Sequence, residues 1–205
     1  MSTATVAERA WISSAIDANG LWLQLGWPTP FGASIAELIE QGSVWAGAVR
    51  TVPVSGGASP PAGLQSLRSL RTVPVSGGAS PQATHPLGFA LLFPMADPEK
   101  RELIQATPRP EDRNAFTALN AFDAILYAAF EVFGLKGLTL RIRKDNPQPL
   151  AILRRVGIEP NFEVPLLGST YLYTEIDQRR WEQRLAKLKA RDPEPFSRGA
   201  DAEEG

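Results

Sequence analysis

The stretch from Phe116 to Phe133 constrains the fold more than any other part of the chain, because its apolar residues recur at steps of three and four. Such spacing lines up one wide apolar stripe along a helix, and Gly134 follows where a helix commonly ends in the left-handed conformation. We therefore expect a long amphipathic helix that ends at Gly134. The residues of the stripe are Leu119, Phe122, Leu126, Phe130 and Phe133.

A strand and a second helix are expected directly after that helix. Leu138, Leu140 and Ile142 alternate with polar residues, which is the pattern of a strand with one buried face. Asp145-Asn146-Pro147 then supplies an N-cap and a proline at the first helical position, and Gly157 stops the second helix. Periodicity alone thus predicts the order helix, strand, helix.

The rest of the chain predicts a mixture of short helices and strands. The hydrophobic content of 43% is enough for a real core. Because helical and strand patterns both occur, we expect an α/β protein. Helices are expected at Ala10–Ala18, at Ile35–Glu40 and around Trp181–Leu188, and strands at Val44–Val49, Pro86–Pro94, Glu102–Thr107, Phe162–Leu167 and Thr170–Ile176.

An identical string of eleven residues occupies Arg50–Pro60 and again Arg71–Pro81. Two copies of a Gly-, Pro- and Ser-rich unit are too few and too polar to stack as a repeat domain. We expect residues 50–85 to be a disordered loop that expands the turn of a hairpin, and residues 192–205 to be an acidic flexible tail. Residues 1–205 then form a single domain.

Composition excludes several classes of site. The chain has no cysteine and a single histidine, His85, which leaves no thiolate ligand or cysteine nucleophile and little for a zinc site. The net charge of -1 gives no overall attraction to nucleic acid or to an anionic membrane. We therefore expect a soluble cytoplasmic protein without a metal site, and expect neither a membrane nor a nucleic acid as a partner.

Several segments in the second half of the chain resemble the GNAT family of N-acetyltransferases. Pro110–Ala118 stands where that family has its phosphate-binding loop, directly ahead of the long helix. Tyr127–Leu135 and Tyr171–Trp181 resemble the branch that acetylates ribosomal-protein N-termini, and Asp145-Asn146 with Arg154–Ile158 matches a further family segment in type and spacing. The resemblance implies an α/β (α+β) fold of three layers, α/β/α, around a central mixed, splayed sheet.

The resemblance also implies acetyl-CoA as the co-substrate. In the family, backbone N–H groups at the start of the long helix face the pyrophosphate of coenzyme A, helped by the helix dipole and an arginine. Phe116 stands where the family has a glycine, so this acetyl-CoA loop is degenerate, although Ala118 keeps the second small position. Asn146 would bind the cofactor or cap its helix. The residues expected at the cofactor are Arg113, Asn114, Ala115, Phe116, Thr117, Ala118 and Asn146.

The catalytic positions of the family are altered as well. Leu153 stands at the place of the usual tyrosine general acid and Pro149 at the place of a serine, and neither side chain can donate a proton. Glu102 is the carboxylate candidate for the general base, and an exposed glutamate on a strand edge is the alternative explanation.

Two functions are implied by the resemblance. The first is an acetyl-CoA-dependent N-acetyltransferase that moves an acetyl group to a primary amine, on a small molecule or at a protein N-terminus. The second is a catalytically inactive scaffold that binds an acyl-CoA or a protein.

Overall fold

The computed structural model describes residues 5–18, 32–49, 86–113, 115–166 and 168–191. The duplicated insert, His85 and the acidic tail lie outside these residues. The helices are α1 (Val6–Ala18), α3 (Gly32–Glu40), the 3-10 turn η1 (Pro110–Asp112), α5 (Ala115–Tyr127), the π-helical turn η2 (Ala128–Val132), α6 (Pro147–Arg155) and α7 (Gln178–Arg191), and the strands are β1 (Trp45–Val49), β2 (Gly88–Pro94), β3 (Lys100–Ala106), β4 (Gly137–Arg143), β5 (Phe162–Leu166) and β6 (Ser169–Asp177).

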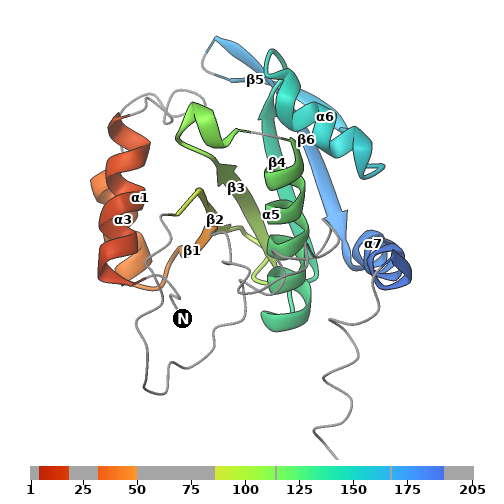
Figure 1. Ribbon diagram of the computed structural model, residues 1–205, viewed down its shortest axis with the longest axis horizontal. Helices are drawn as coiled ribbons and strands as arrows, with labels where there is room; N and C mark the ends of the chain where they lie inside the picture. The colour runs from red at the N-terminus through yellow and green to blue at the C-terminus, as the bar shows by residue number, and fades with distance from the viewer. Residues whose placement is uncertain (1–4, 19–31, 50–85, 114, 167, 192–205) are drawn as a thin grey trace, which may run out of the picture.

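The strands form one mixed sheet in the order β1-β2-β3-β4-β6-β5 (Figure 1). Only β3 and β4 are parallel, and α5 makes the crossover between them. The other neighbours are antiparallel, including the predicted hairpin of β1 and β2, in which Trp45 lies opposite Leu92. The mixed sheet expected from the sequence is therefore confirmed.

Helices cover both faces of this sheet, α1 and α3 on one side and α5, α6 and α7 on the other (Figure 1). Each face of the sheet has its own hydrophobic core. Neighbouring side chains of β3 point to opposite faces, so Ile104 packs with α1 and α3 whereas Leu103 packs with α5. On β4, Leu138, Leu140 and Ile142 all point toward α5, as their spacing predicted. The three-layer α/β/α arrangement is confirmed.

The first helix begins earlier than its apolar spacing indicated. The Thr5 hydroxyl accepts a hydrogen bond from the Glu8 backbone N–H at 3.2 Å, and the Glu8 carboxylate accepts one from the Thr5 backbone N–H at 2.8 Å. This reciprocal capping box satisfies two helix-terminal donors and starts α1 at Val6, ahead of the predicted Ala10.

The long predicted helix is interrupted near its end. After Tyr127 the chain continues as η2, in which the Phe133 N–H donates to the Ala128 carbonyl at 3.0 Å, and Gly134 then has the expected positive φ of 65°. The extra residue in a π turn rotates the later side chains about the helix axis. Phe133 consequently leaves the predicted apolar stripe: its side chain is 37% exposed and contacts the ring of Trp45 with 4.6 Å between centroids.

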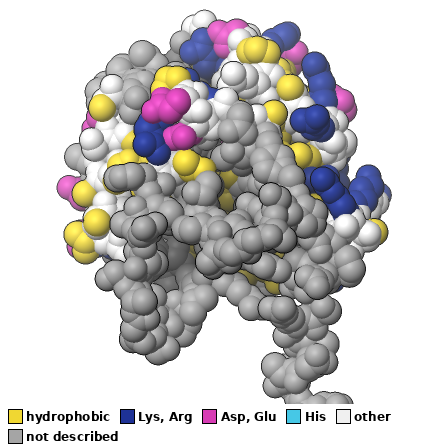
Figure 2. Space-filling model, viewed as in Figure 1, with side chains coloured by type: hydrophobic (Ala, Val, Ile, Leu, Met, Phe, Trp, Pro, Cys, Tyr) yellow, Lys and Arg dark blue, Asp and Glu magenta, His cyan; other side chains and the backbone are white. Residues whose placement is uncertain are grey.

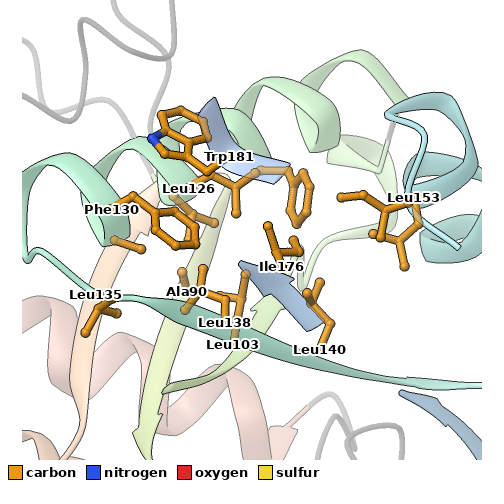
Figure 3. Close-up of a cluster of buried hydrophobic side chains, with 14 of the residues drawn as sticks. Ala90, Leu103, Leu126, Phe130, Leu135, Leu138, Leu140, Leu153, Ile176 and Trp181 are labelled. Atoms are coloured by element: carbon orange, nitrogen blue, oxygen red, sulfur yellow. The ribbon is translucent and has the colours of Figure 1, made fainter. Parts of the chain in front are cut away.

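The larger core forms between the sheet and the α5 layer, where Figure 3 shows Trp181 of α7 lying against Phe130. Trp181 is fully buried, and its ring stacks on that of Phe130 with 5.9 Å between centroids. On the same helix, the Arg184 guanidinium donates to both carboxylate oxygens of buried Asp123, at 2.6 and 2.8 Å. These contacts fix α7 to α5. None of the described helices combines the length and the apolar character needed to cross a bilayer.

Candidate active site

The parallel strands β3 and β4 separate part-way along their length. Their pairing runs from Lys100 opposite Gly137 to Leu103 opposite Leu140 and ends there. Both strands continue for three more residues, Ile104–Ala106 on β3 and Arg141–Arg143 on β4, which pair only with their outer neighbours β2 and β6. We call these two stretches the divergent segment. Their facing backbone edges can therefore bond a group inserted between them.

The start of α5 lies beside the divergent segment. The Gln105 side-chain amide donates to the Ala118 carbonyl at 3.3 Å, which joins the end of β3 to the first turn of α5. The backbone of Ala115–Ala118, predicted to face phosphates, is thereby placed next to the separation of the strands. Asn114 and the side chains of Phe116 and Thr117 fall outside the described part of the chain.

Arg113 braces the connection that leads into α5. Its guanidinium donates to the Thr107 carbonyl at 2.9 Å and to the Pro108 carbonyl at 2.7 Å, so it closes the loop onto the end of β3. Arg109 pairs with Asp112 at 2.8 Å within the same turn. Arg113 therefore has a structural role that the sequence did not indicate, and its contact with a phosphate stays a prediction.

Asn146 does not cap α6 with its side chain. The residue occupies the N-cap position with an extended backbone, but no hydrogen bond from its side chain to the helix is formed. The capping interpretation of this side chain is therefore wrong. Pro149, at the third helical position, has no backbone N–H, which removes one of the two donors that an N-cap side chain accepts from. Gly157, with a φ of 77°, ends the helix as expected.

An ion pair closes the turn between β4 and α6. Arg143 Nε donates to Asp145 Oδ1 at 2.9 Å. This hydrogen bond and the nearby guanidinium charge hold the pKa of Asp145 below its ordinary 3.8. Because the folded pKa is lowered, the pair contributes stability above pH 3.8 and loses it as the pH falls through the folded value.

NMR titration of the Asp145 carboxyl carbon should therefore give a pKa below 3.8, with the Arg143→Gln variant returning it toward that value. Equal values in the two proteins would show that the pair does not form in solution.

The two positions that the GNAT resemblance matches to a proton donor hold side chains that cannot donate one. Leu153 is 2% exposed and packs in the core beneath α6, so its place holds no proton donor. Pro149 lies half-buried in the first turn of the same helix. Neither of these two side chains can therefore act as a general acid.

Glu102 lies on an inner strand, which makes the strand-edge explanation wrong. Its side chain is 25% exposed, and its Oε1 lies 2.9 Å from Nε of Arg141 on the neighbouring strand. Among the described residues, this buried oxygen accepts no hydrogen bond. Glu102 itself pairs with Thr139 in the last paired residues of β3, and its partner Arg141 is the first β4 residue of the divergent segment. The carboxylate therefore lies next to the divergent segment with lone-pair capacity for a further donor.

Arg141 and Tyr171 also belong to this site, and the sequence did not predict that either would lie beside Glu102. The Arg141 guanidinium carbon lies 5.8 Å from the centre of the buried Tyr171 ring. A cation beside an aromatic face is held electrostatically, which positions the arginine that pairs with Glu102. The alternation of β4 placed Arg141 on the polar face, but only the strand pairing brings it to Glu102. In the part of the chain that the structure describes, no group of three His, Asp or Glu side chains could hold a metal ion.

No family model and no curated protein matches the sequence of this chain. Solved structures do share its arrangement of helices and strands. A solved spermidine N-acetyltransferase from Vibrio cholerae, in complex with CoA and spermine, superposes with a TM-score of 0.61 at 10% identity, over 87% of this chain and 95% of the other. An aminoglycoside acetyltransferase in complex with coenzyme A gives 0.57 at 13% identity, over 88% and 95%. The chain has the fold of these acetyltransferases.

This acetyltransferase fold is the one that the GNAT resemblance predicted from Pro110–Ala118 and the segments after it. The superposed region covers 95% of each of the two solved enzymes. The narrower resemblance to the ribosomal-protein branch stays a prediction, as do the individual roles of the site residues.

Proposed function

We propose that this protein is an acetyl-CoA-dependent N-acetyltransferase that acetylates a primary amine. One observation carries the proposal: β3 and β4 diverge after Leu103 and Leu140, beside the first turn of α5, in a chain with the fold of enzymes solved with coenzyme A. The divergence exposes backbone groups for an extended pantetheine arm, and the helix start offers N–H groups to a pyrophosphate.

The residues that would hold acetyl-CoA lie around the first turn of α5. Backbone N–H groups of Ala115–Ala118 point out of the helix start, where the helix dipole favours an anion. Arg113 and Asn114 precede them, and Asn146 lies at the corresponding end of β4. Acetyl-CoA supplies the acetyl group as a thioester.

Transfer of the acetyl group needs a base to deprotonate the attacking amine more than it needs an acid to protonate the leaving sulfur. The amine attacks the thioester carbonyl, whose oxygen a backbone N–H of the divergent segment would polarise. Glu102 would accept the proton that the amine loses, because its Oε1 has capacity for a further donor at this point of the sheet. The C–S bond then breaks and the sulfur leaves as a thiolate. A thiol is acidic enough, with a pKa near 8.5, for the thiolate to depart and take its proton from water. The apolar Leu153 is compatible with that route.

A second candidate is a scaffold that binds an acyl-CoA or a protein without turnover. It is favoured by the burial of Leu153 at the family's acid position and by the use of Arg113 to brace its own loop. Binding and turnover separate the two candidates.

The test combines cofactor binding with product release. Acetyl-CoA at about 100 times its dissociation constant should stabilise the protein by about 2.7 kcal/mol, seen as a raised Tm, because it binds only the folded state. Release of free thiol in the presence of primary amines then identifies the enzyme. A raised Tm without thiol release supports the scaffold, and an unchanged Tm at millimolar acetyl-CoA contradicts both acyl-CoA functions.

A further inference from the structure

Glu102 and Arg141 extend from the same face of the sheet, the one opposite α5. Leu103, the next residue on β3, packs against α5, as do Leu140 and Ile142 on either side of the arginine. Neighbouring side chains of a strand point to opposite faces, so the carboxylate and the guanidinium meet on the other side. The ion pair of 2.9 Å between Arg141 Nε and Glu102 Oε1 is the contact through which Arg141 can act on the proposed base.

The ring of Tyr171 fixes the position of Arg141. Tyr171 is 2% exposed, and the centre of its ring lies 5.8 Å from the guanidinium carbon. The β4–β6 register places it there, because Tyr171 pairs with Arg143, two residues along β4 from Arg141. A cation within about 6 Å of a ring centre is attracted to the ring, and a buried ring has already lost its rotamer freedom on folding. The guanidinium is therefore held by a group that is itself fixed in the sheet.

The carboxylate of Glu102 depends on such a partner for its position. Its side chain has several rotatable bonds and is 25% exposed, so packing holds it only in part. A base must lie within hydrogen-bond reach of the proton that it takes, and a group misplaced by about 1 Å can lose about 100-fold in rate. Among the described residues Oε1 accepts no hydrogen bond, so the charge of Arg141 holds the carboxylate while its bonding capacity stays open to the amine.

A second ion pair on the same face of the sheet offers a matched comparison. Lys100 Nζ on β3 donates to Glu175 Oε1 on β6 at 2.6 Å. Lys100 lies opposite Gly137, where β3 and β4 are still paired, whereas Arg141 belongs to the divergent segment. Both pairs join inner strands, but only that of Arg141 lies next to the place proposed for the thioester. A purely structural role would make the two basic side chains alike in their effect on turnover.

We infer that Arg141 is a positioning residue for the proposed reaction. Held by the ring of Tyr171, it fixes the Glu102 carboxylate at the place where the amine gives up its proton. The inference rests on the proposed function and adds two residues to its site. Arg141 acts only through Glu102, and Tyr171 acts only through Arg141. The ring of Tyr171, and not its hydroxyl, carries the effect.

The experiment measures kcat for thiol release with whichever of butylamine, benzylamine and a tripeptide with a free N-terminus the wild-type protein turns over fastest. Arg141→Met should lower kcat by about tenfold, part of what misplacing a base costs, and leave KM for acetyl-CoA unchanged. In the Glu102→Gln background the same substitution should change kcat by no more than about twofold, because no base is left to position. Lys100→Met removes the matched ion pair and should also keep kcat within about twofold of the wild-type value.

Two substitutions of Tyr171 separate its ring from its hydroxyl. Tyr171→Phe keeps the ring and should retain kcat within about twofold. Tyr171→Leu removes the ring and should approach the loss expected for Arg141→Met. This pair of variants also tests the inference if Arg141→Met does not fold.

Side-chain NMR of the free protein adds a readout that needs no turnover. The Arg141 Nε–H resonance should shift in Glu102→Gln and in Tyr171→Leu and stay in place in Lys100→Met. An unshifted resonance in the first two variants would overturn the inference.

Multiplied losses of kcat, about 1000-fold in the double variant of Glu102 and Arg141, would show that Arg141 acts independently of Glu102 and would also overturn the inference. Equal kcat values in Tyr171→Phe and Tyr171→Leu would do the same. Failure of the proposed function is a different result, in which the wild-type protein releases no thiol with any of the amines.

Discussion

Replacing Trp181 by alanine is expected to lower the free energy of unfolding by about 4 kcal/mol, within the range for removing a buried tryptophan. The side chain is fully buried, stacks on Phe130 and makes an edge contact with Tyr127, at 6.3 Å between centroids. Its indole N–H also donates to Glu131 Oε1 at 2.6 Å. The substitution removes this contact area and leaves a cavity between α5, η2 and α7. Urea denaturation measures the change.

Two further variants serve as controls for the loss of unfolding free energy in Trp181→Ala, one at the same position and one elsewhere on α7. Trp181→Phe keeps an aromatic ring against Phe130 but loses the hydrogen bond to Glu131, so it should cost clearly less than the alanine variant. Lys187→Ala, at an exposed position of α7, should change stability by no more than about 0.5 kcal/mol. A loss below about 1 kcal/mol for Trp181→Ala would show that α7 is not packed as described.

Replacing Glu102 by glutamine is expected to lower kcat by about 100-fold, the smaller end of what a general base contributes. The amide keeps the shape of the side chain beside Arg141 but cannot take the proton of the attacking amine. The affinity for acetyl-CoA should remain unchanged, since Glu102 lies on the face opposite α5. Thiol release and a cofactor titration measure the two quantities separately.

Glu175→Gln is the matched control for that substitution. Glu175 is also an ion-paired carboxylate on an inner strand, but its partner Lys100 lies where β3 and β4 are still paired. Its loss should leave kcat within about threefold, because any effect is limited to the stability of a partly exposed ion pair. Equal losses of kcat in the two variants would assign Glu102 a purely structural role.

Strong local periodicity predicted most of the fold. The stripe from Leu119 to Phe130 and the alternation of Leu138, Leu140 and Ile142 each fix an element regardless of what surrounds it. The π turn after Tyr127 could not be predicted from this periodicity. One extra residue in a turn alters the helix geometry, but the amino-acid composition of the helix does not reveal it. The exposure of Phe133 is a consequence of that turn.

The candidate site was less predictable, because its contacts join residues that are distant in sequence. Glu102 and Arg141 meet only through the register of β3 and β4. The residue type of Asn146 favours side-chain capping, but Pro149 at the third helical position offers no N–H for such a bond. On the face drawn in Figure 2, basic side chains lie in several separate groups with acidic side chains beside some of them, so charge alone does not mark one site on that face.

Addition of acetyl-CoA to isotope-labelled protein, followed by backbone amide NMR, tests most directly whether an acyl-CoA lies where β3 and β4 diverge. The expected result is a set of shifted amides at Ile104–Ala106, Arg141–Arg143, Arg113–Ala118 and Asn146, with small changes in the paired stretch from Lys100 to Leu103. Unchanged spectra at millimolar acetyl-CoA, or shifts centred on α1 and α3, would contradict the proposed site.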